Sequence, residues 1–178
     1  MEIPPPPEFK VIEWAPKDTA LLILDIQNQN CNAERRPRCV ASVLKIKELL
    51  VRARKEEVAI VYSLTRNADI SDIIEDVATV EGEPVVKSGG DKVFNTSLDE
   101  ILRGKNIKKM IVVSTSAHGA VLHTATGASA RGYKVIVPVD GISASSKYPE
   151  QYTAWHLVNA PGSRKQTSLT KSDLIHFS

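Results

Sequence analysis

Short apolar segments alternate with amphipathic segments along almost the whole chain, and this alternation limits the fold more than any other feature. Residues 19–26 (TALLILDI) form a continuous apolar run, as expected for a strand that is buried on both faces. Residues 40–55 then predict a helix, because Val43, Ile46 and Leu50 recur at spacings of three and four on one face. The alternation predicts an α/β fold with one parallel sheet and helices on both of its faces.

The same patterns place the remaining elements. Strands are predicted at residues 19–26, 58–63, 84–87, 109–114, 134–139 and 166–169, and helices at residues 40–55, 69–80, 96–103, 119–131 and 149–159. In a parallel sheet, ligands bind beyond the carboxyl ends of the strands. Polar residues gather after four of these ends, which are the segments that begin at Asp25, Ser63, Lys87 and Ser114.

Length and charge exclude several classes of function. A chain of 178 residues fits one domain, which we assign to residues 19–178, preceded by a Pro-rich arm at residues 1–18. A net charge of +2 without a basic block argues against a nucleic-acid partner. The chain lacks an apolar run of about 20 residues, which argues against a membrane partner. The prolines at residues 4–7 replace the apolar core of a signal peptide, so a cytoplasmic location is expected.

Cys31 and Cys39 are too few for a disulfide framework, and we predict that both are free thiols. A local bridge between them is the alternative in an oxidising or hyperthermophilic cell. Cys31 lies shortly after a predicted strand, but nothing in the sequence places a base beside it, so a role as nucleophile is the weaker interpretation.

Three segments carry the candidate chemistry. Asp25 follows four apolar residues, either as a functional carboxylate or as a turn cap at the strand end. Lys87 ends the third strand and is the preferred lysine. Lys92 is its rival, because the Gly89-Gly90 turn leaves open which of the two aligns with the site. A lysine beside a buried Asp favours the ionised pair, whereas either lysine could instead lie on the surface. Residues 114–120 lead into a helix whose first N–H groups are free to bind an oxyanion.

Together these segments resemble the isochorismatase-like cysteine hydrolases. Residues 22–27 match an apolar strand that ends in Asp, and Phe94, Thr96 and Leu98 match the residues that follow the family lysine. Residues 110–141 match the active-site segment. The resemblance implies a three-layer Rossmann-like sandwich with a central parallel sheet of about six strands. It also implies a small-molecule substrate, no cofactor and a homo-oligomer (dimer or tetramer), for which Tyr152, Trp155 and Leu157 are candidate contacts. No metal is expected, because the sequence has no His-x-His or Glu-x-x-His spacing.

The nucleophile of these hydrolases is a cysteine four residues before a Thr-Ala pair, and the matching residue is Ala120. In the cysteine members, Asp accepts the thiol proton and N–H groups bind the oxyanion, often beside a non-proline cis peptide. Loss of such a nucleophile costs about 10⁶-fold in turnover, so an amidase mechanism through this position is excluded. Isochorismatases also lack the cysteine and carry Ala-His at the positions of Ala117 and His118. They split a vinyl ether with water.

The resemblance therefore implies a hydrolase that acts without a thiol. Its implied catalytic residues are Asp25, Lys87 and the nucleophile position Ala120, and its implied substrate contacts are Gln27, Lys92, Phe94, Ser116, His118 and Gly119. A nearby lysine lowers the pKa of Asp25, which favours a base that activates water over an acid. Ser116 replaces the expected tyrosine, and His118 either contacts substrate or pins the loop. The alternative is a binding or regulatory protein that retains the fold without catalysis.

Overall fold

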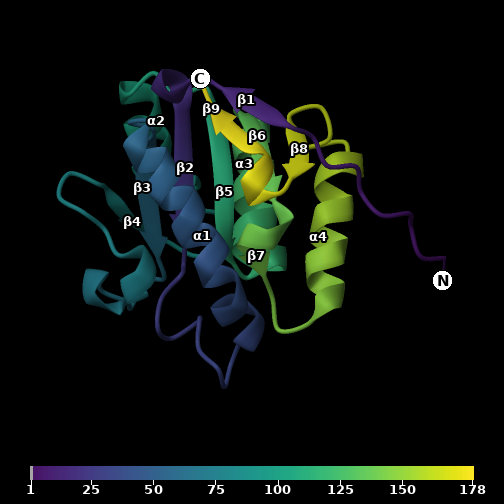
Figure 1. Cartoon of the computed structure of the whole chain (residues 1–178), viewed down its shortest axis with the longest axis horizontal. Coiled ribbons are helices and arrows are strands. Elements are labelled where there is room, and N and C mark those ends of the chain that lie inside the picture. The colour runs from purple at the N-terminus through teal and green to yellow at the C-terminus, as the bar shows by residue number, and fades with distance from the viewer. Residues whose placement is uncertain (1) are drawn as a thin grey trace.

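A parallel sheet of seven strands runs through the computed structural model, which describes residues 2–178 (Figure 1). This sheet confirms the predicted α/β class, with one strand more than expected. From edge to edge it contains β4 (Val85–Lys87), β3 (Ala59–Leu64), β2 (Thr19–Leu24), β5 (Lys109–Thr115), β6 (Lys134–Pro138) and β8 (Thr167–Thr170), and the short β7 (Ile142–Ser143) pairs with β5.

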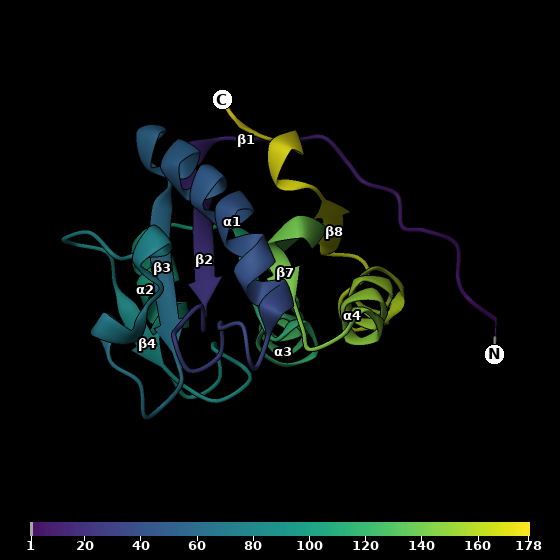
Figure 2. The same cartoon turned by 60° about the horizontal axis from the view of Figure 1, so that its bottom comes forward.

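Helices cover both faces of the sheet: α1 (Pro37–Lys55), α2 (Leu98–Gly104), α3 (Leu122–Ala130) and α4 (Lys147–Asn159). Successive side chains of a strand point to opposite faces. Leu21 and Ile23 accordingly pack in the core cluster that contains the buried side of α1. Leu22 and Leu24 pack in the second cluster, which includes residues of α2, α3 and α4. The result is a three-layer arrangement, with α1 on one side of the sheet and α3 on the other (Figure 2).

None of the helices within residues 2–178 is both long and apolar enough to cross a membrane. On α4, Tyr152 and Trp155 are exposed and lie with ring centroids 6.3 Å apart. Leu157, which the sequence had grouped with them, is fully buried in the core. Leu157 is therefore not available for the predicted subunit contact, because it lies on the face of the helix that packs against the sheet.

A second, two-stranded sheet joins the beginning and the end of the chain and was not predicted. β1 (Ile12–Trp14) pairs in parallel with β9 (Ile175–Phe177), and Ile12 lies opposite Ile175. β1 lies within residues 1–18, for which only an irregular arm was expected; Met1 lies outside the described residues. Three-residue strands give too weak a periodic pattern to be recognised from sequence.

The helix predicted at residues 69–80 is not formed. Two short 3₁₀ turns, Ile70–Asp72 and Glu75–Val77, take its place. Between them the chain is extended, because Ile73 forms a bridge to Gln27 and the N–H of Ile74 donates to the carbonyl of Ile26. Hydrogen bonds to the segment after β2 therefore replace those of a helix.

The prediction of free thiols is also wrong, because Cys31 and Cys39 form a disulfide. Cys31 lies on the loop between β2 and α1, Cys39 lies in the first turn of α1, and both are buried. The bridge removes Cys31 as a candidate nucleophile. It also fastens the β2–α1 loop to the helix that follows it.

We expect the disulfide to stabilise the fold. A bridge across a sequence separation of 8 residues reduces the entropy of the unfolded chain by an amount worth about 2.5 kcal/mol. Replacement of Cys31→Ala together with Cys39→Ala should lower the free energy of unfolding by about this amount, as measured by urea denaturation. Thiol titration of the denatured wild type should detect no thiol without reductant and both cysteines with it. Detection of two thiols without reductant would contradict the bridge.

Candidate functional site

Asp25 lies directly after β2, at the carboxyl end of the sheet. Its backbone has a conformation that residues other than glycine rarely adopt. Its φ is +55°, in the left-handed region that costs most residues of order 1 kcal/mol or more. The backbone N–H of Asp25 donates to the carbonyl of Ser63 at the end of β3. The residue is 6% exposed. The strand end thus turns sharply and directs a carboxylate into a buried position.

The carboxylate of Asp25 is held by two neighbours. Its Oδ2 lies 2.7 Å from Nζ of Lys92, and its Oδ1 accepts a hydrogen bond of 2.9 Å from Oγ of Ser63. The Lys92 side chain is fully buried, and its Nζ also donates to the carbonyl of Ser88. Removal of one partner from such a buried ion pair strongly destabilises the fold, because the other charge is left buried without a counter-charge.

Burial dominates the acidity of Asp25. It raises the pKa of the carboxyl above the ordinary value of 3.8, and the charge and hydrogen bond of Lys92 only partly oppose it. Ser63 and Arg36 oppose it further. The expectation that the lysine sets a lowered pKa was therefore wrong in direction, because loss of water around the carboxyl outweighs the attraction. A raised pKa suits a proton donor better than a base.

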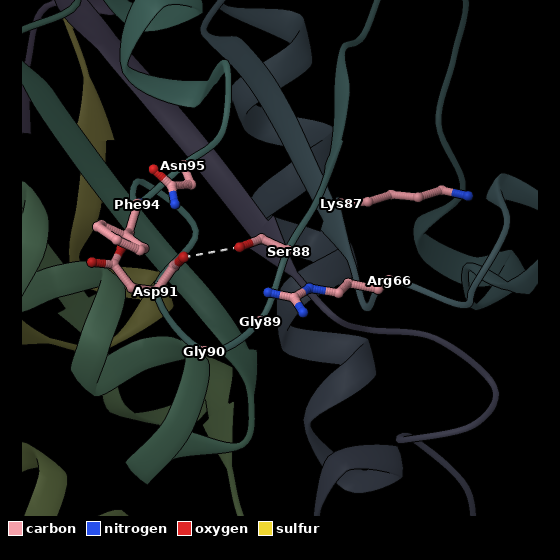
Figure 3. Close-up of a pocket in the computed structure, with 8 residues that line it drawn as sticks. All are labelled: Arg66, Lys87, Ser88, Gly89, Gly90, Asp91, Phe94 and Asn95. Atoms are coloured by element: carbon pink, nitrogen blue, oxygen red, sulfur yellow. Dashed lines mark hydrogen bonds between the residues drawn. The ribbon is translucent and has the colours of Figure 1, made fainter.

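Lys92, and not Lys87, is the lysine at this site. Lys87 is 44% exposed at its side chain and pairs with the exposed Asp69 at 3.0 Å. In Figure 3 its side chain points away from the loop of Ser88 and Asp91. Lys87 is the last residue of β4, whereas the loop that follows folds back toward β2 and delivers Lys92. The sequence preference for Lys87 is thus corrected by the path of this loop.

Contacts with α3 fix the loop that carries Lys92. The backbone N–H of Lys92 donates to Oγ1 of the buried Thr124 at 3.0 Å. Gly127 permits close approach, since a Cβ at this position would lie 2.7 Å from Oδ2 of Asp91. Asp91 in turn accepts hydrogen bonds from the N–H groups of Val93 and Phe94. The position of Lys92 therefore depends on the small and polar residues of α3.

Gln27 belongs to the framework around the site. Its Oε1 accepts from the N–H of Thr65, and its Nε2 donates to Oγ1 of Thr65 and to Oε1 of Gln29. Both N–H groups of this fully buried amide are thus used within the protein. The amide joins the loops that follow β2 and β3, and its role as a substrate contact stays a prediction.

The segment after β5 forms the third part of the site. The peptide bond between Thr115 and Ser116 is cis, and the turn Ala117–Val121 precedes α3. Ala120 is 5% exposed and belongs to the buried cluster that also contains Leu24 and Val93. The N–H of Gly119 donates to the carbonyl of Ser116, so this predicted oxyanion donor is occupied within the turn.

His118 is exposed, and its imidazole forms no side-chain hydrogen bond within residues 2–178. The interpretation that it pins the loop is therefore wrong, and contact with a ligand stays a prediction.

Phe94 is 62% exposed and lines a pocket of about 200 Å³. Arg66 reaches into the same pocket beside Gly89 and Gly90 (Figure 3).

Two neighbours of Asp25 were not identified as site residues from the sequence. Ser63 is the hydrogen-bond donor to the carboxylate, and its position at the end of β3 was a usable signal because β3 pairs with β2. Arg36 acts on the carboxyl through its charge. Arg36 directly precedes α1, and no sequence pattern indicated that the β2–α1 loop returns to the strand end.

A family model described as the isochorismatase domain matches residues 19–168. The chain belongs to the isochorismatase family. The match covers the strand that ends at Asp25, the loop of Lys92 and the turn of Ala120, which confirms the family resemblance drawn from those segments.

Known proteins support the same family assignment. The secreted isochorismatase effector Isc1 of Verticillium dahliae is 29% identical over 138 residues, which cover 71% of this chain and 73% of that protein. A cysteine hydrolase from Pseudomonas syringae pv. phaseolicola superposes with a TM-score of 0.81 at 20% identity, covering 92% of this chain and 94% of the other. The N-carbamoylsarcosine amidase from Thermoplasma acidophilum gives 0.76 at 21% identity, covering 88% and 97%. These structures establish the shared isochorismatase-like fold.

The two lysines should differ sharply in their contribution to stability. Lys92→Met leaves the Asp25 carboxylate buried without its cation and should lower the free energy of unfolding by about 3–5 kcal/mol. Lys87→Met removes an exposed pair and should change it by less than about 1 kcal/mol. Denaturant titration of both variants measures the difference. Equal losses would show that Lys92 does not hold a buried ion pair.

Proposed function

We propose that this protein hydrolyses a vinyl ether bond in a small molecule, with Asp25 as general acid and without a covalent intermediate. The observation that carries this function is the Asp25 carboxyl: it is buried, has a raised pKa and is paired with Lys92. Membership of the isochorismatase family supports hydrolysis. Vinyl ethers need proton delivery to carbon, which a carboxylic acid of raised pKa provides.

The proposed reaction has three steps. The Asp25 carboxyl proton transfers to the terminal =CH₂ carbon of the vinyl ether, and the double-bond electrons form the new C–H bond. Water then adds to the resulting oxocarbenium carbon and gives a hemiketal. Cleavage of the ether C–O bond releases an alcohol and a methyl ketone, and the proton that water loses restores Asp25. The sum is one vinyl ether and one water converted into one alcohol and one ketone.

Lys92 and Ser63 are suited to stabilise the charge that forms on Asp25. As the proton leaves, negative charge develops on a carboxylate whose oxygens already lie 2.7 Å from Nζ of Lys92 and 2.9 Å from Oγ of Ser63. Groups that are fixed before the reaction stabilise such charge without reorganisation. Lys92 thus stabilises the carboxylate that the proton transfer leaves on Asp25, whereas burial stabilises the protonated carboxyl before the transfer.

Ala120 supports a mechanism without a nucleophile. We propose that it occupies the position of the nucleophilic cysteine found in the thiol-dependent members of the family. Ala120 is 5% exposed and lies in an apolar cluster, and its methyl group cannot attack a carbonyl. Amide hydrolysis through a covalent intermediate is therefore not part of the proposed function.

The same alanine favours a second candidate function. A protein that lost its nucleophile while keeping the Asp25–Lys92 pair could retain ligand binding without turnover. In this case the isochorismatase fold would serve as a binding or regulatory protein. Turnover by the wild type separates the two functions.

We also make proposals about the cellular location and the oligomeric state of the protein. The predicted cytoplasmic location is less favoured now that Cys31 and Cys39 form a disulfide, because such bonds persist mainly in oxidising compartments. We propose a homo-oligomer in which the exposed Tyr152 and Trp155 of α4 contact a second subunit.

The rate should fall as pH rises if Asp25 is the general acid. Only the protonated carboxyl donates, and the raised pKa of Asp25 keeps it protonated at higher pH than an ordinary carboxyl. The pH profile of kcat/KM for vinyl ether hydrolysis should therefore descend through a pKa above 3.8. Asp25→Asn should lower kcat by roughly 10²–10⁴-fold and remove this limb.

Asp69→Asn is the matched control, because Asp69 is an exposed carboxylate that pairs with Lys87 away from the site. Its profile should follow the wild type. A limb that ascends through the pKa of Asp25 would identify a base instead of an acid and would refute this role.

Substrate screening with Ala120→Cys distinguishes the two candidate functions. The wild type should hydrolyse vinyl ethers and leave amides and ureides intact, since loss of a covalent nucleophile costs about 10⁶-fold. If turnover of all three substrate classes is absent in the wild type and appears only in the cysteine variant, the protein is a binding module. Product formation is measured by liquid chromatography.

A further inference from the structure

Three aromatic side chains form an exposed row along α4, which we call the aromatic stripe. Tyr148, Tyr152 and Trp155 share one face of the helix, because they are spaced by four and three residues. Their exposed fractions are 66%, 39% and 45%. Neighbouring rings of the stripe have centroids 6.4 Å and 6.3 Å apart. Adjacent exposed rings of this kind mark a surface on which a partner docks.

The aromatic stripe is apolar in the middle and basic at its ends. Lys147 begins α4, and the turn after the helix carries Arg164 and Lys165; all three cations are exposed. Glu150 is the acidic residue of α4, and it is held by two hydrogen bonds from Arg38. The stripe therefore favours a segment that is apolar in the middle and acidic at both ends.

Residues 2–8, at the tip of the Pro-rich arm, have this pattern, and we call them the proline segment. Four consecutive prolines, Pro4 to Pro7, lie between Glu2 and Glu8, and every residue of the segment is exposed. Consecutive prolines form a polyproline II helix, which is preformed and loses little entropy on binding. Aromatic-lined surfaces are the usual receptors of such helices. The proline segment and the aromatic stripe therefore match in shape and in charge.

The proline segment points away from its own domain. The hydrogen bonds that attach the arm to the domain begin at Lys10, whose N–H donates to the carbonyl of Leu169 and whose carbonyl accepts from Oγ1 of Thr170. Toward its N-terminal end, the chain leaves the domain on the side of α4 and ends clear of it (Figure 1 and Figure 2). A polyproline helix stays extended over several residues. The segment is therefore presented to a second copy and does not bend back onto the α4 of its own chain.

We propose that the proline segment of one copy docks on the aromatic stripe of a second copy, and that two copies exchange these segments reciprocally. A polyproline helix rises about 3.1 Å per residue, so four prolines span about 9 Å. This span exceeds the 6.4 Å and 6.3 Å between neighbouring rings, so the prolines contact at least two rings at once. Reciprocal exchange uses the same surface on both copies and closes a dimer. The contact deepens the proposed homo-oligomer and does not depend on the proposed hydrolysis.

Sedimentation equilibrium of two sets of variants tests the contact. Tyr152→Ser with Trp155→Ser removes two rings of the stripe, and Pro4→Ser through Pro7→Ser removes the polyproline helix. Either set should raise the dissociation constant of the dimer roughly ten- to hundredfold, because aromatic anchors carry much of the binding energy of an interface. The two sets combined should raise it no further than one set alone, because each already removes the same contact. Circular dichroism should stay unchanged, since all of these side chains are exposed.

Val51→Ser is the matched control, since it removes an apolar side chain that is 58% exposed on α1 instead of α4. It should leave the dissociation constant unchanged. Additive losses from the two sets would show that segment and stripe bind separate surfaces and would overturn the contact. A dimer that neither set weakens overturns the contact and leaves the proposed homo-oligomer standing, whereas a wild type that stays monomeric at every concentration overturns both. None of these outcomes bears on turnover at Asp25.

A spin label shows from which copy the segment comes. Cys31 and Cys39 are joined in a disulfide, so Ile3→Cys adds a single free thiol at a position that is 92% exposed in the wild type. The spin-labelled chain, without ¹⁵N, is mixed with ¹⁵N-labelled wild type. The indole N–H signal of Trp155 should broaden more than that of Trp14, which is the reference. Equal broadening of both signals, or none, overturns the contact. Broadening only when the spin label and ¹⁵N are on the same chain shows that the segment covers its own α4, and this also overturns it.

Discussion

The removal of a carboxylate and an ammonium group from water is the constraint on which this structure depends. Asp25 and Lys92 are buried on two different loops. Burial of each charge is tolerated only because the opposite charge of the other lies beside it. Around them, Ser63 and the carbonyl of Ser88 use the remaining hydrogen-bonding capacity. The loops after β2, β3 and β4 must therefore keep one relative arrangement, which the pairing of those strands provides.

Desolvation also gives the site its chemical character. An exposed Asp beside a lysine has a low pKa and carries no proton to donate at neutral pH, whereas the buried Asp25 has a raised pKa. The left-handed backbone at this residue places the carboxyl in that environment at a cost in conformational energy. Backbone strain and burial of a carboxyl group both disfavour folding, and both occur at Asp25, the residue that we propose as the general acid.

Sequence patterns were sufficient for the framework and insufficient for its loops. The apolar runs predicted β2 and β5 because a strand buried on both faces has few alternatives. Asp25 was found for the same reason, since it interrupts such a run. The choice of Lys87 over Lys92 failed because the path of a glycine turn depends on contacts with Thr124 and α3, which are distant in sequence. The disulfide and Arg36 depend likewise on how the β2–α1 loop folds back.

The pairing of β1 with β9 has a consequence for the order of assembly. The two strands come from opposite ends of the chain, so their ladder closes the longest loop that the described residues contain. Such long-range contacts form late, because the entropy of closing the intervening loop must be overcome first. During synthesis, β1 is made before every strand of the central sheet, and its partner β9 is made after all of them. The central sheet can therefore form before this ladder closes.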